Sequence, residues 1–304
     1  MPFQRGRVVV GLATHVFQVH RRKIDMSRRI CTCVGVRAAG RRALMVAAAL
    51  AAVVAPPPAA LAGTDTFVAD GVTLRLVALL PDADGRMRAA LALDLDPGWK
   101  TYWIAPGPVG LAPRLDFSAS EGVSDPTVSF PVPIRFAEGE AQSVGYDAPV
   151  EFAIHARADT PAPTLRLDAF LGICRELCVP LQAVLEALPS DRLSDRALVA
   201  RAESTAPAET GLLAPTAARW SADGGSLRFA LAHGAGGVPL DAFVSAGDGW
   251  AFGPPVTEGS DGAEELSLPV LSRPPNAPDA ARVDILLTAG ESAQLSRAVP
   301  VAPR

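Results

Sequence analysis

The sequence predicts an all-β protein: an antiparallel β-sandwich followed by a second, smaller β-sandwich-like domain. Three observations lead to this fold class. Short runs of alternating apolar and polar residues recur after residue 63, clusters of Pro, Gly and Asp separate them, and long helical patterns are missing between them. Many short strands at this spacing are typical of antiparallel sandwiches.

The first 62 residues form a predicted secretory signal peptide. Residues 1–42 carry ten Lys and Arg residues against one acidic residue, and the apolar run ALMVAAALAAVVA follows. A basic region, an apolar core and small residues at the end are the marks of a signal peptide, with cleavage expected after Ala62. The mature protein is therefore expected to be soluble and periplasmic, in a compartment where disulfides persist.

Several features of this signal stay open. The basic segment before the apolar run, residues 1–42, is long for a signal peptide, so Met26 is an alternative start. Arginine pairs at 28–29 and 41–42 leave the twin-arginine route open beside ordinary secretion. A retained membrane anchor is another alternative, although the apolar run is short for a bilayer span.

The mature chain is acidic. Beyond residue 62 it has 18 basic and 31 acidic residues, a formal net charge of −13. Nucleic acids and anionic membrane surfaces bind basic surfaces, so the sequence predicts neither as a partner. No later stretch is long and apolar enough to span a membrane, and membrane contact is expected only through a partner protein.

The first domain is predicted over residues 63–190. Residues 71–80 and 86–95 alternate around a Gly-containing turn, which indicates a β-hairpin. Further strands are predicted at 112–117, 126–132, 149–156 and 164–173.

A change of pattern separates the two domains. Residues 191–215 are predicted to be a linker that contains a short helix capped at Ser194. The second domain is predicted over residues 216–304. Its clearest strands are 226–232, 240–246, 264–270 and 282–289.

The stretch LGICRELCVP contains the only two cysteines of the mature chain, Cys174 and Cys178. Strand-like runs precede and follow them. The spacing predicts a hairpin with the loop Arg175, Glu176 and Leu177, and with the cysteines opposed at its mouth. Opposed residues have Cα atoms roughly 4.5–5.5 Å apart, within reach of a disulfide.

Three roles are open for this pair. A structural disulfide would stabilise little, because closing a ring of about five residues gains only ~2 kcal/mol. A redox disulfide is favoured, since short or exposed disulfides are the labile ones. Metal binding is the weakest: His155 and His233 are the only histidines after residue 62, so a four-ligand zinc site lacks ligands. Capture of Cu(I) by two thiolates remains chemically possible, but we predict neither a metal nor a bound cofactor.

The charges near the cysteines do not clearly favour the thiolate over the thiol. Arg175 favours the anion and Glu176 opposes it. Lys100, the only lysine after residue 62, would matter if the fold placed it nearby.

Three segments resemble a known family in sequence and order: residues 98–113, 130–152 and 170–180. They are similar to the amino-terminal periplasmic domain of DsbD-type thiol:disulfide interchange proteins, and closest to soluble relatives linked to copper-stress tolerance. The resemblance covers roughly residues 63–190. It implies an immunoglobulin-like fold that receives electrons from a membrane-embedded thiol reductase and passes them to oxidised periplasmic proteins.

The resemblance also implies roles for particular residues. Cys174 and Cys178 match the redox pair, with Cys178 as the attacking residue and Cys174 as the resolving one. Phe136 falls where the family has an aromatic cap that shields the pair and moves aside for partners. Tyr102 and Tyr146 fall where aromatic residues line the site. The alternative for these three aromatic residues is packing in the sandwich core.

The sequence departs from the family pattern in two ways. Three residues separate the cysteines, whereas the best-known members have five. The chain also lacks the membrane domain of full-length members, so the expected electron donor is a separate protein and the direction of electron flow stays open.

A function of a different class remains as the alternative: a periplasmic binding or adaptor module with a structural disulfide. Its surface would be sought at the four tryptophans, Trp99, Trp103, Trp220 and Trp250, although buried packing is the default for each.

Overall fold

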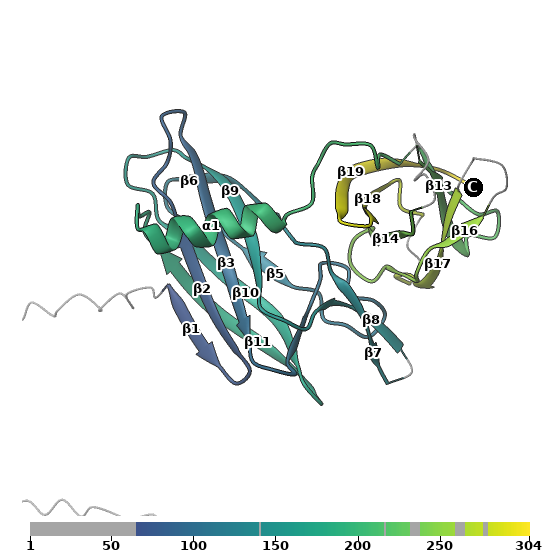
Figure 1. Cartoon of the computed structure of the whole chain (residues 1–304), viewed down its shortest axis with the longest axis horizontal. Helices are drawn as coiled ribbons and strands as arrows, with labels where there is room; N and C mark the ends of the chain where they lie inside the picture. Colours follow the sequence, from purple (N-terminus) through teal and green to yellow (C-terminus); the bar gives the residue numbers. More distant parts are fainter. Residues whose placement is uncertain (1–64, 140, 216, 232–237, 259–264, 276–278) are drawn as a thin grey trace, which may run out of the picture. The chain divides into compact units, whose positions relative to one another are not determined.

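The computed structural model describes residues 65–139, 141–215, 217–231, 238–258, 265–275 and 279–304. The predicted signal peptide, Cys31, Cys33 and His233 lie outside the described residues. The described part is almost entirely β-structure, as the sequence predicts (Figure 1).

The first region is a sandwich of two antiparallel sheets. The first sheet has the order β1 (Thr66–Ala69), β2 (Val72–Ala78), β3 (Arg86–Leu95), β9 (Val150–Ala158) and β6 (Val123–Ser129). The second has the order β11 (Cys178–Ala187), β10 (Leu165–Cys174), β4 (Lys100–Tyr102), β8 (Ala141–Tyr146) and β7 (Ile134–Glu138), with β5 (Arg114–Asp116) paired to β10. The expectation of an immunoglobulin-like β-sandwich is confirmed.

Every second side chain along the strands points inward and fills the core between these sheets. Leu91 and Leu93 of β3 meet Leu167 and Leu171 of β10 in one buried cluster. Each such side chain, fully buried, contributes roughly 1.5–3 kcal/mol. The period-two pattern that predicts the strands is therefore also the pattern that fills the core.

The single helix of the described residues, α1 (Leu193–Thr205), packs on the outer face of the first sheet (Figure 1). The contact explains why small apolar residues occupy outward positions of the central strands. Its buried cluster consists of Val77, Ala90, Ala153, Leu198, Val199 and Ala202.

The predicted cap at Ser194 is wrong. The helix begins at Leu193 with Arg192 as its N-cap, and no side chain caps it. Ser194 lies inside the first turn, where its hydroxyl donates to Asp195 (3.2 Å). The buried carboxylate of Asp195 instead forms an ion pair with the partly exposed Arg75 of β2 (2.7 Å), so a contact with the sheet holds this end of the helix.

The second region is a continuous hydrogen-bonded path of strands. Its order is β14 (Leu240–Ser245), β18 (Arg282–Ala289), β19 (Ser292–Ala302), β12 (Ala218–Trp220), β13 (Ser226–Ala230), β17 (Glu265–Ser272) and β15 (Ala251–Phe252), with β16 (Val256–Glu258) paired to β17. The pairing of β12 with β19 is parallel. Val244 and Ile285 from one half of the path meet Phe229 and Leu268 from the other in one core, so the path folds over on itself.

All elements fall within the ranges predicted for the two domains and the linker, but the exact boundaries stay a prediction. Within the described residues, no helix has the length and apolarity that a membrane crossing requires.

Candidate functional site: the disulfide at the mouth of the β10–β11 hairpin

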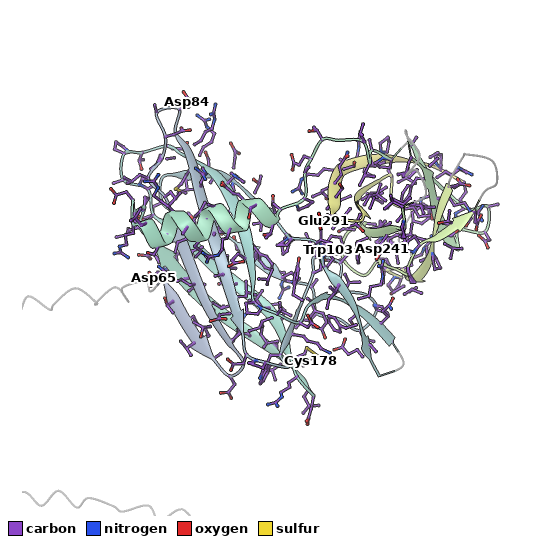
Figure 2. The ribbon with its side chains drawn as sticks, viewed as in Figure 1. Asp65, Asp84, Trp103, Cys178, Asp241 and Glu291 are labelled. Carbon is purple, nitrogen blue, oxygen red and sulfur yellow. A yellow bond between two sulfur atoms is a disulfide. The ribbon has the colours of Figure 1, made fainter. Side chains whose placement is uncertain are left out.

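The two cysteines end one strand and begin the next. Strands β10 and β11 pair in continuous register, and Cys174 lies directly opposite Cys178. The Cα atoms are 4.1 Å apart, slightly closer than expected, and the two residues form a disulfide. The hairpin and its three-residue loop are thus as predicted. Figure 2 shows Cys178 near the end of this hairpin.

The two cysteine residues differ in exposure. The Cys174 residue is 3% exposed, whereas Cys178 belongs to the exposed loop end of β11. Two apolar neighbours, Leu177 and Val179, are also exposed, at 80% and 54%. Since disulfide exchange needs access to the attacked sulfur, a partner can reach Cys178 far more easily than Cys174.

Tyr102 lies beneath the disulfide. Strand β4 runs beside β10, with Lys100 opposite Cys174. The Tyr102 hydroxyl oxygen lies 2.9 Å from Cys178 Sγ and 3.1 Å from Cys174 Sγ. The residue is 1% exposed, so its ring is fixed by packing. The structure therefore places this predicted lining residue at the cysteines.

Gly172 makes room for that ring. A Cβ at residue 172 would lie 2.7 Å from Tyr102 Cδ2 and 2.8 Å from Leu111 Cβ, closer than real carbon contacts. The absence of a side chain there thus lets the tyrosine lie flat against β10. The glycine in LGIC consequently belongs to the site.

Glu138, at the end of β7, completes the polar contacts. Its Oε1 accepts a hydrogen bond from the Tyr102 hydroxyl (2.6 Å) and lies 3.1 Å from Cys178 Sγ. Its Oε2 accepts a short hydrogen bond from the hydroxyl of Ser143, a fully buried residue on β8. In the disulfide state neither sulfur carries a proton, so the tyrosine hydroxyl is the donor between these groups.

These contacts keep Tyr102 protonated. Burial, followed by the hydrogen bond to Glu138 and its negative charge, raises the pKa of Tyr102 well above its ordinary value. The phenol is therefore a hydrogen-bond donor at any working pH.

Phe136 lies on the same strand as Glu138. Because they are two positions apart along the strand, both side chains emerge on the same face of β7. The Phe136 ring is half-buried, its centroid 6.2 Å from that of Tyr102, and Lys100 Nζ lies 4.7 Å from its centroid. The fold thus brings Lys100 near the cysteines, where its ammonium group lies over the ring of Phe136, the predicted cap.

Tyr146 lies elsewhere. It is 7% exposed, its hydroxyl donates to the carbonyl of Pro131 (2.9 Å), and its ring packs 5.8 Å from that of Phe152 in the sandwich core. These contacts favour the packing alternative for Tyr146 over a place at the disulfide.

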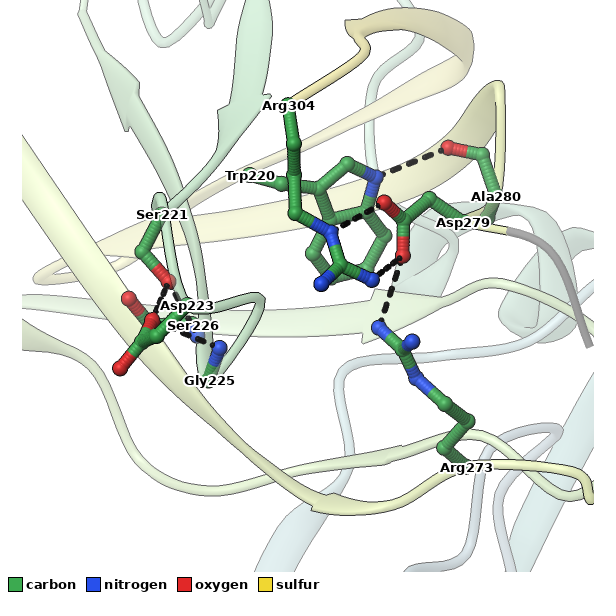
Figure 3. A network of polar contacts seen from close by, with 9 residues as sticks. All are labelled: Trp220, Ser221, Asp223, Gly225, Ser226, Arg273, Asp279, Ala280 and Arg304. Atoms are coloured by element: carbon green, nitrogen blue, oxygen red, sulfur yellow. Dashed lines mark hydrogen bonds and ion pairs between the residues drawn. The ribbon is translucent and has the colours of Figure 1, made fainter.

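The tryptophans do not form an exposed surface. Trp103, Trp220 and Trp250 are between 4% and 7% exposed, and Trp99 is partly buried against the core. Figure 3 shows Trp220 donating from Nε1 to the carbonyl of Ala280. The binding-module alternative therefore finds no support in these four residues.

Sequence reasoning missed Glu138 and Ser143. The signal that could have found Glu138 is its place two residues after Phe136 in RFAEGE. The carboxylate also adds a third ligand atom beside the sulfurs. Glu138, Cys174 and Cys178 place their ligand atoms within 4.8 Å of one another.

Comparisons with known proteins find a family for the region that contains this disulfide. Residues 66–190 match the family model described as thiol:disulfide interchange protein DsbD, N-terminal. No curated protein sequence matches the chain. The match supports a thiol:disulfide interchange module in these residues.

Solved structures extend the likeness in fold. The crystal structure of the N-terminal periplasmic domain of ScsB from Proteus mirabilis superposes with a TM-score of 0.60 at 21% identity, and the match covers 78% of this chain and 97% of that one. Such coverage reaches beyond the first sandwich into the second region. The periplasmic chaperone SfaE matches at 8% identity over 76% of this chain and 100% of its own, with a TM-score of 0.17 that supports no argument.

Taken with the disulfide and its surroundings, the comparisons identify residues 66–190 as a domain of the DsbD N-terminal family.

Proposed function

We propose that this protein is a periplasmic thiol:disulfide interchange protein that takes reducing equivalents from a membrane-embedded thiol reductase and passes them to oxidised periplasmic proteins. The observation that supports the proposal is the unequal exposure of the two bonded cysteine residues: Cys178 is exposed and Cys174 is 3% exposed. A disulfide built only as a staple has no need of one open sulfur. Exchange requires it, because the partner attacks or is attacked at one sulfur.

The reducing half-reaction begins with both cysteines as thiols. The Cys178 thiolate attacks one sulfur of a partner disulfide, and the other partner sulfur leaves as a thiolate. Cys174, as thiolate, then attacks Cys178 Sγ, which re-forms the intramolecular disulfide and releases the second partner thiolate. Two electrons pass to the partner, and its two thiolates take up the protons that the two cysteines lose.

Tyr102 and Glu138 act on Cys178 in opposite directions. The tyrosine hydroxyl, 2.9 Å from Cys178 Sγ, can turn its single proton from Glu138 to a Cys178 thiolate and so stabilise the thiolate. The carboxylate, 3.1 Å from the same sulfur, repels a thiolate and can accept the proton of a thiol. Phe136 serves as the cap in this proposal: its side chain is half-buried in the middle of β7 and would move aside for a partner.

The redox midpoint of the disulfide tests the proposal. The protein is equilibrated in thiol redox buffers, and the reduced fraction is read by alkylation of free thiols. We expect a midpoint between about −120 and −270 mV, the range of exchange proteins. A midpoint below about −300 mV would identify a structural disulfide and reject the proposal.

Partner trapping tests the assignment of the two cysteines. Cys174→Ala leaves Cys178 to form mixed disulfides that cannot be resolved, so these should accumulate with periplasmic proteins. Cys178→Ala, the matched control, leaves only the buried thiol and should trap almost none. Equal trapping by both variants would contradict the assigned roles.

A further inference from the structure

Opening the disulfide leaves three anionic ligand atoms in one place. Glu138, Cys174 and Cys178 hold a carboxylate oxygen and two sulfurs within 4.8 Å of one another. In tetrahedral zinc sites thiolate sulfur lies about 2.3 Å and carboxylate oxygen about 2.0–2.2 Å from the ion, so two ligands of one ion are roughly 3.5–3.8 Å apart. The cluster thus has the dimensions of a zinc site once the sulfurs are no longer bonded.

The carboxylate is already oriented for this role. Ser143 donates to Oε2 of Glu138, and Oε1 faces Cys178 Sγ at 3.1 Å. Ser143 is fully buried and lies opposite Phe136 in the β7–β8 pairing, so the sheet itself holds the hydroxyl in place. Hydrogen bonds of this kind to the outer atom of a ligand are typical of metal sites.

The charge of the reduced site also calls for a cation. Among the described residues, Glu138 is in no ion pair with a lysine or arginine. Lys100, the nearby cation, directs Nζ toward the ring of Phe136, 4.7 Å from its centroid. Two thiolates beside an unpaired carboxylate repel one another, and a bound divalent ion removes that repulsion.

We propose that the reduced protein binds one Zn²⁺ through Cys174 Sγ, Cys178 Sγ and Glu138 Oε1, with the fourth position open on the exposed side of Cys178. A thiol or phosphine reductant first supplies the two electrons that break the S–S bond, and two protons give the dithiol. Zn²⁺ then displaces these protons as it binds the thiolates. The bound ion occupies both sulfurs, so it blocks thiol exchange and protects the pair from re-oxidation.

The carboxylate selects the metal. Zn²⁺ accepts mixed sulfur and oxygen ligands, whereas Cu(I) prefers soft thiolates and needs no carboxylate. Glu138 should therefore strengthen the binding of Zn²⁺ and have little effect on the binding of Cu(I). This difference separates a built three-ligand site from a plain pair of thiols.

Competition with a chromophoric chelator tests the site. The mature protein, residues 63–304, lacks Cys31 and Cys33, so Cys174 and Cys178 are its only thiols. It is reduced with a phosphine, freed of the phosphine without oxygen, and titrated with Zn²⁺. We expect one equivalent to bind to the reduced protein and none to the disulfide form, with affinity at least about tenfold weaker in Glu138→Gln. Glu176→Gln, which removes an exposed carboxylate from the same hairpin loop, is the matched control and should bind like the wild type. Cu(I) affinity should change less than twofold in Glu138→Gln.

Three outcomes would overturn the inference. These are equal Zn²⁺ affinity in the wild type and Glu138→Gln, equal binding by the disulfide form, and no binding by a wild-type sample with two titratable thiols. Thiol counts and circular dichroism of each variant exclude a folding defect. Because a chemical reductant opens the disulfide, failure here leaves the proposed exchange function standing, and failure of exchange leaves the zinc site testable.

Discussion

Both β-rich regions contain aromatic rings beside a cationic side chain, but the polar atoms around these rings differ. In the second region Trp220, Trp250 and Phe252 stack with centroids 5.3–6.3 Å apart, and the guanidinium of Arg273 lies 4.8 Å from the Trp250 centroid. In the first region Tyr102 and Phe136 are 6.2 Å apart, with Lys100 over Phe136. Judged by aromatic and cationic composition alone, the second cluster would be the better candidate for a functional site.

The charged groups beside the second cluster are paired with one another. Asp279 accepts hydrogen bonds from Arg273 (2.8 Å) and Arg304 (2.6 and 2.7 Å), as Figure 3 shows. These bonds, chiefly those from Arg304, hold the pKa of Asp279 below its ordinary value. At the disulfide, by contrast, the hydroxyl of Tyr102 and the carboxylate of Glu138 meet a bond that can open. A functional cluster is thus recognised by where its polar atoms point.

The largest effect should come from breaking the second cluster. Trp220→Ala removes a residue that is 4% exposed and leaves a cavity, so we expect a loss of about 3–5 kcal/mol in the free energy of unfolding. Chemical denaturation followed by circular dichroism measures it. The redox midpoint of the Cys174–Cys178 pair should stay unchanged. Val256→Ala, at a residue that is 56% exposed, is the control and should cost less than about 0.5 kcal/mol.

Tyr102→Phe should change reactivity. The variant removes the hydroxyl that can donate to a Cys178 thiolate, and a hydrogen bond to a charged group contributes about 1.5–3 kcal/mol. The thiol pKa should therefore rise by roughly one to two units, since 1.36 kcal/mol corresponds to one unit. Alkylation rates across pH, with a metal chelator present, measure this pKa. An unchanged dependence of the alkylation rate on pH would mean that Tyr102 does not stabilise the Cys178 thiolate.

Glu138→Gln should shift the same pKa in the opposite direction. Removing a negative charge beside Cys178 favours the thiolate, so the thiol pKa should fall by about one unit and alkylation at pH 7 should be up to about tenfold faster. The chelator again excludes effects of bound metal. Glu176→Gln serves as control, because that side chain lies in the exposed loop. A rise in the thiol pKa would contradict the repulsion on which this prediction depends.

The smallest effect is expected at Lys100. Lys100→Met removes the cation over the Phe136 ring, a contact that contributes about 0.5–1 kcal/mol at an exposed site. If this contact helps to hold the cap closed, alkylation of reduced Cys178 should be about two- to fivefold faster in the variant. A slower reaction would mean that Lys100 acts mainly by favouring the thiolate.

The hairpin that contains the cysteines could be predicted because a short, continuous stretch of sequence defines it. Alternation before Cys174 and after Cys178 defines the two strands, and the three residues between them define the turn. The rest of the site comes from β4 and β7, which lie in the same sheet in the order β11, β10, β4, β8, β7. That order does not follow the chain, so no local pattern places Tyr102 and Glu138 at the sulfurs.

The hairpin β7–β8 was not predicted as strands at all. Its positions are largely half-exposed along β7, so apolar and polar residues do not alternate clearly there. The same limit applies to Tyr146, whose motif matches the family but whose ring faces the core. Sequence resemblance places a residue along the chain, whereas the face on which its side chain lies depends on the sheet.

The smallness of the disulfide ring has a consequence for repeated use. The bond joins two residues that the ten residue pairs of β10 and β11 already hold opposite each other. Opening it releases about 2 kcal/mol of constraint on the unfolded chain and removes no tie between distant parts of the fold. The protein can therefore be reduced without losing the pairing of β10 and β11, and its free energy of unfolding should fall by no more than about 2 kcal/mol.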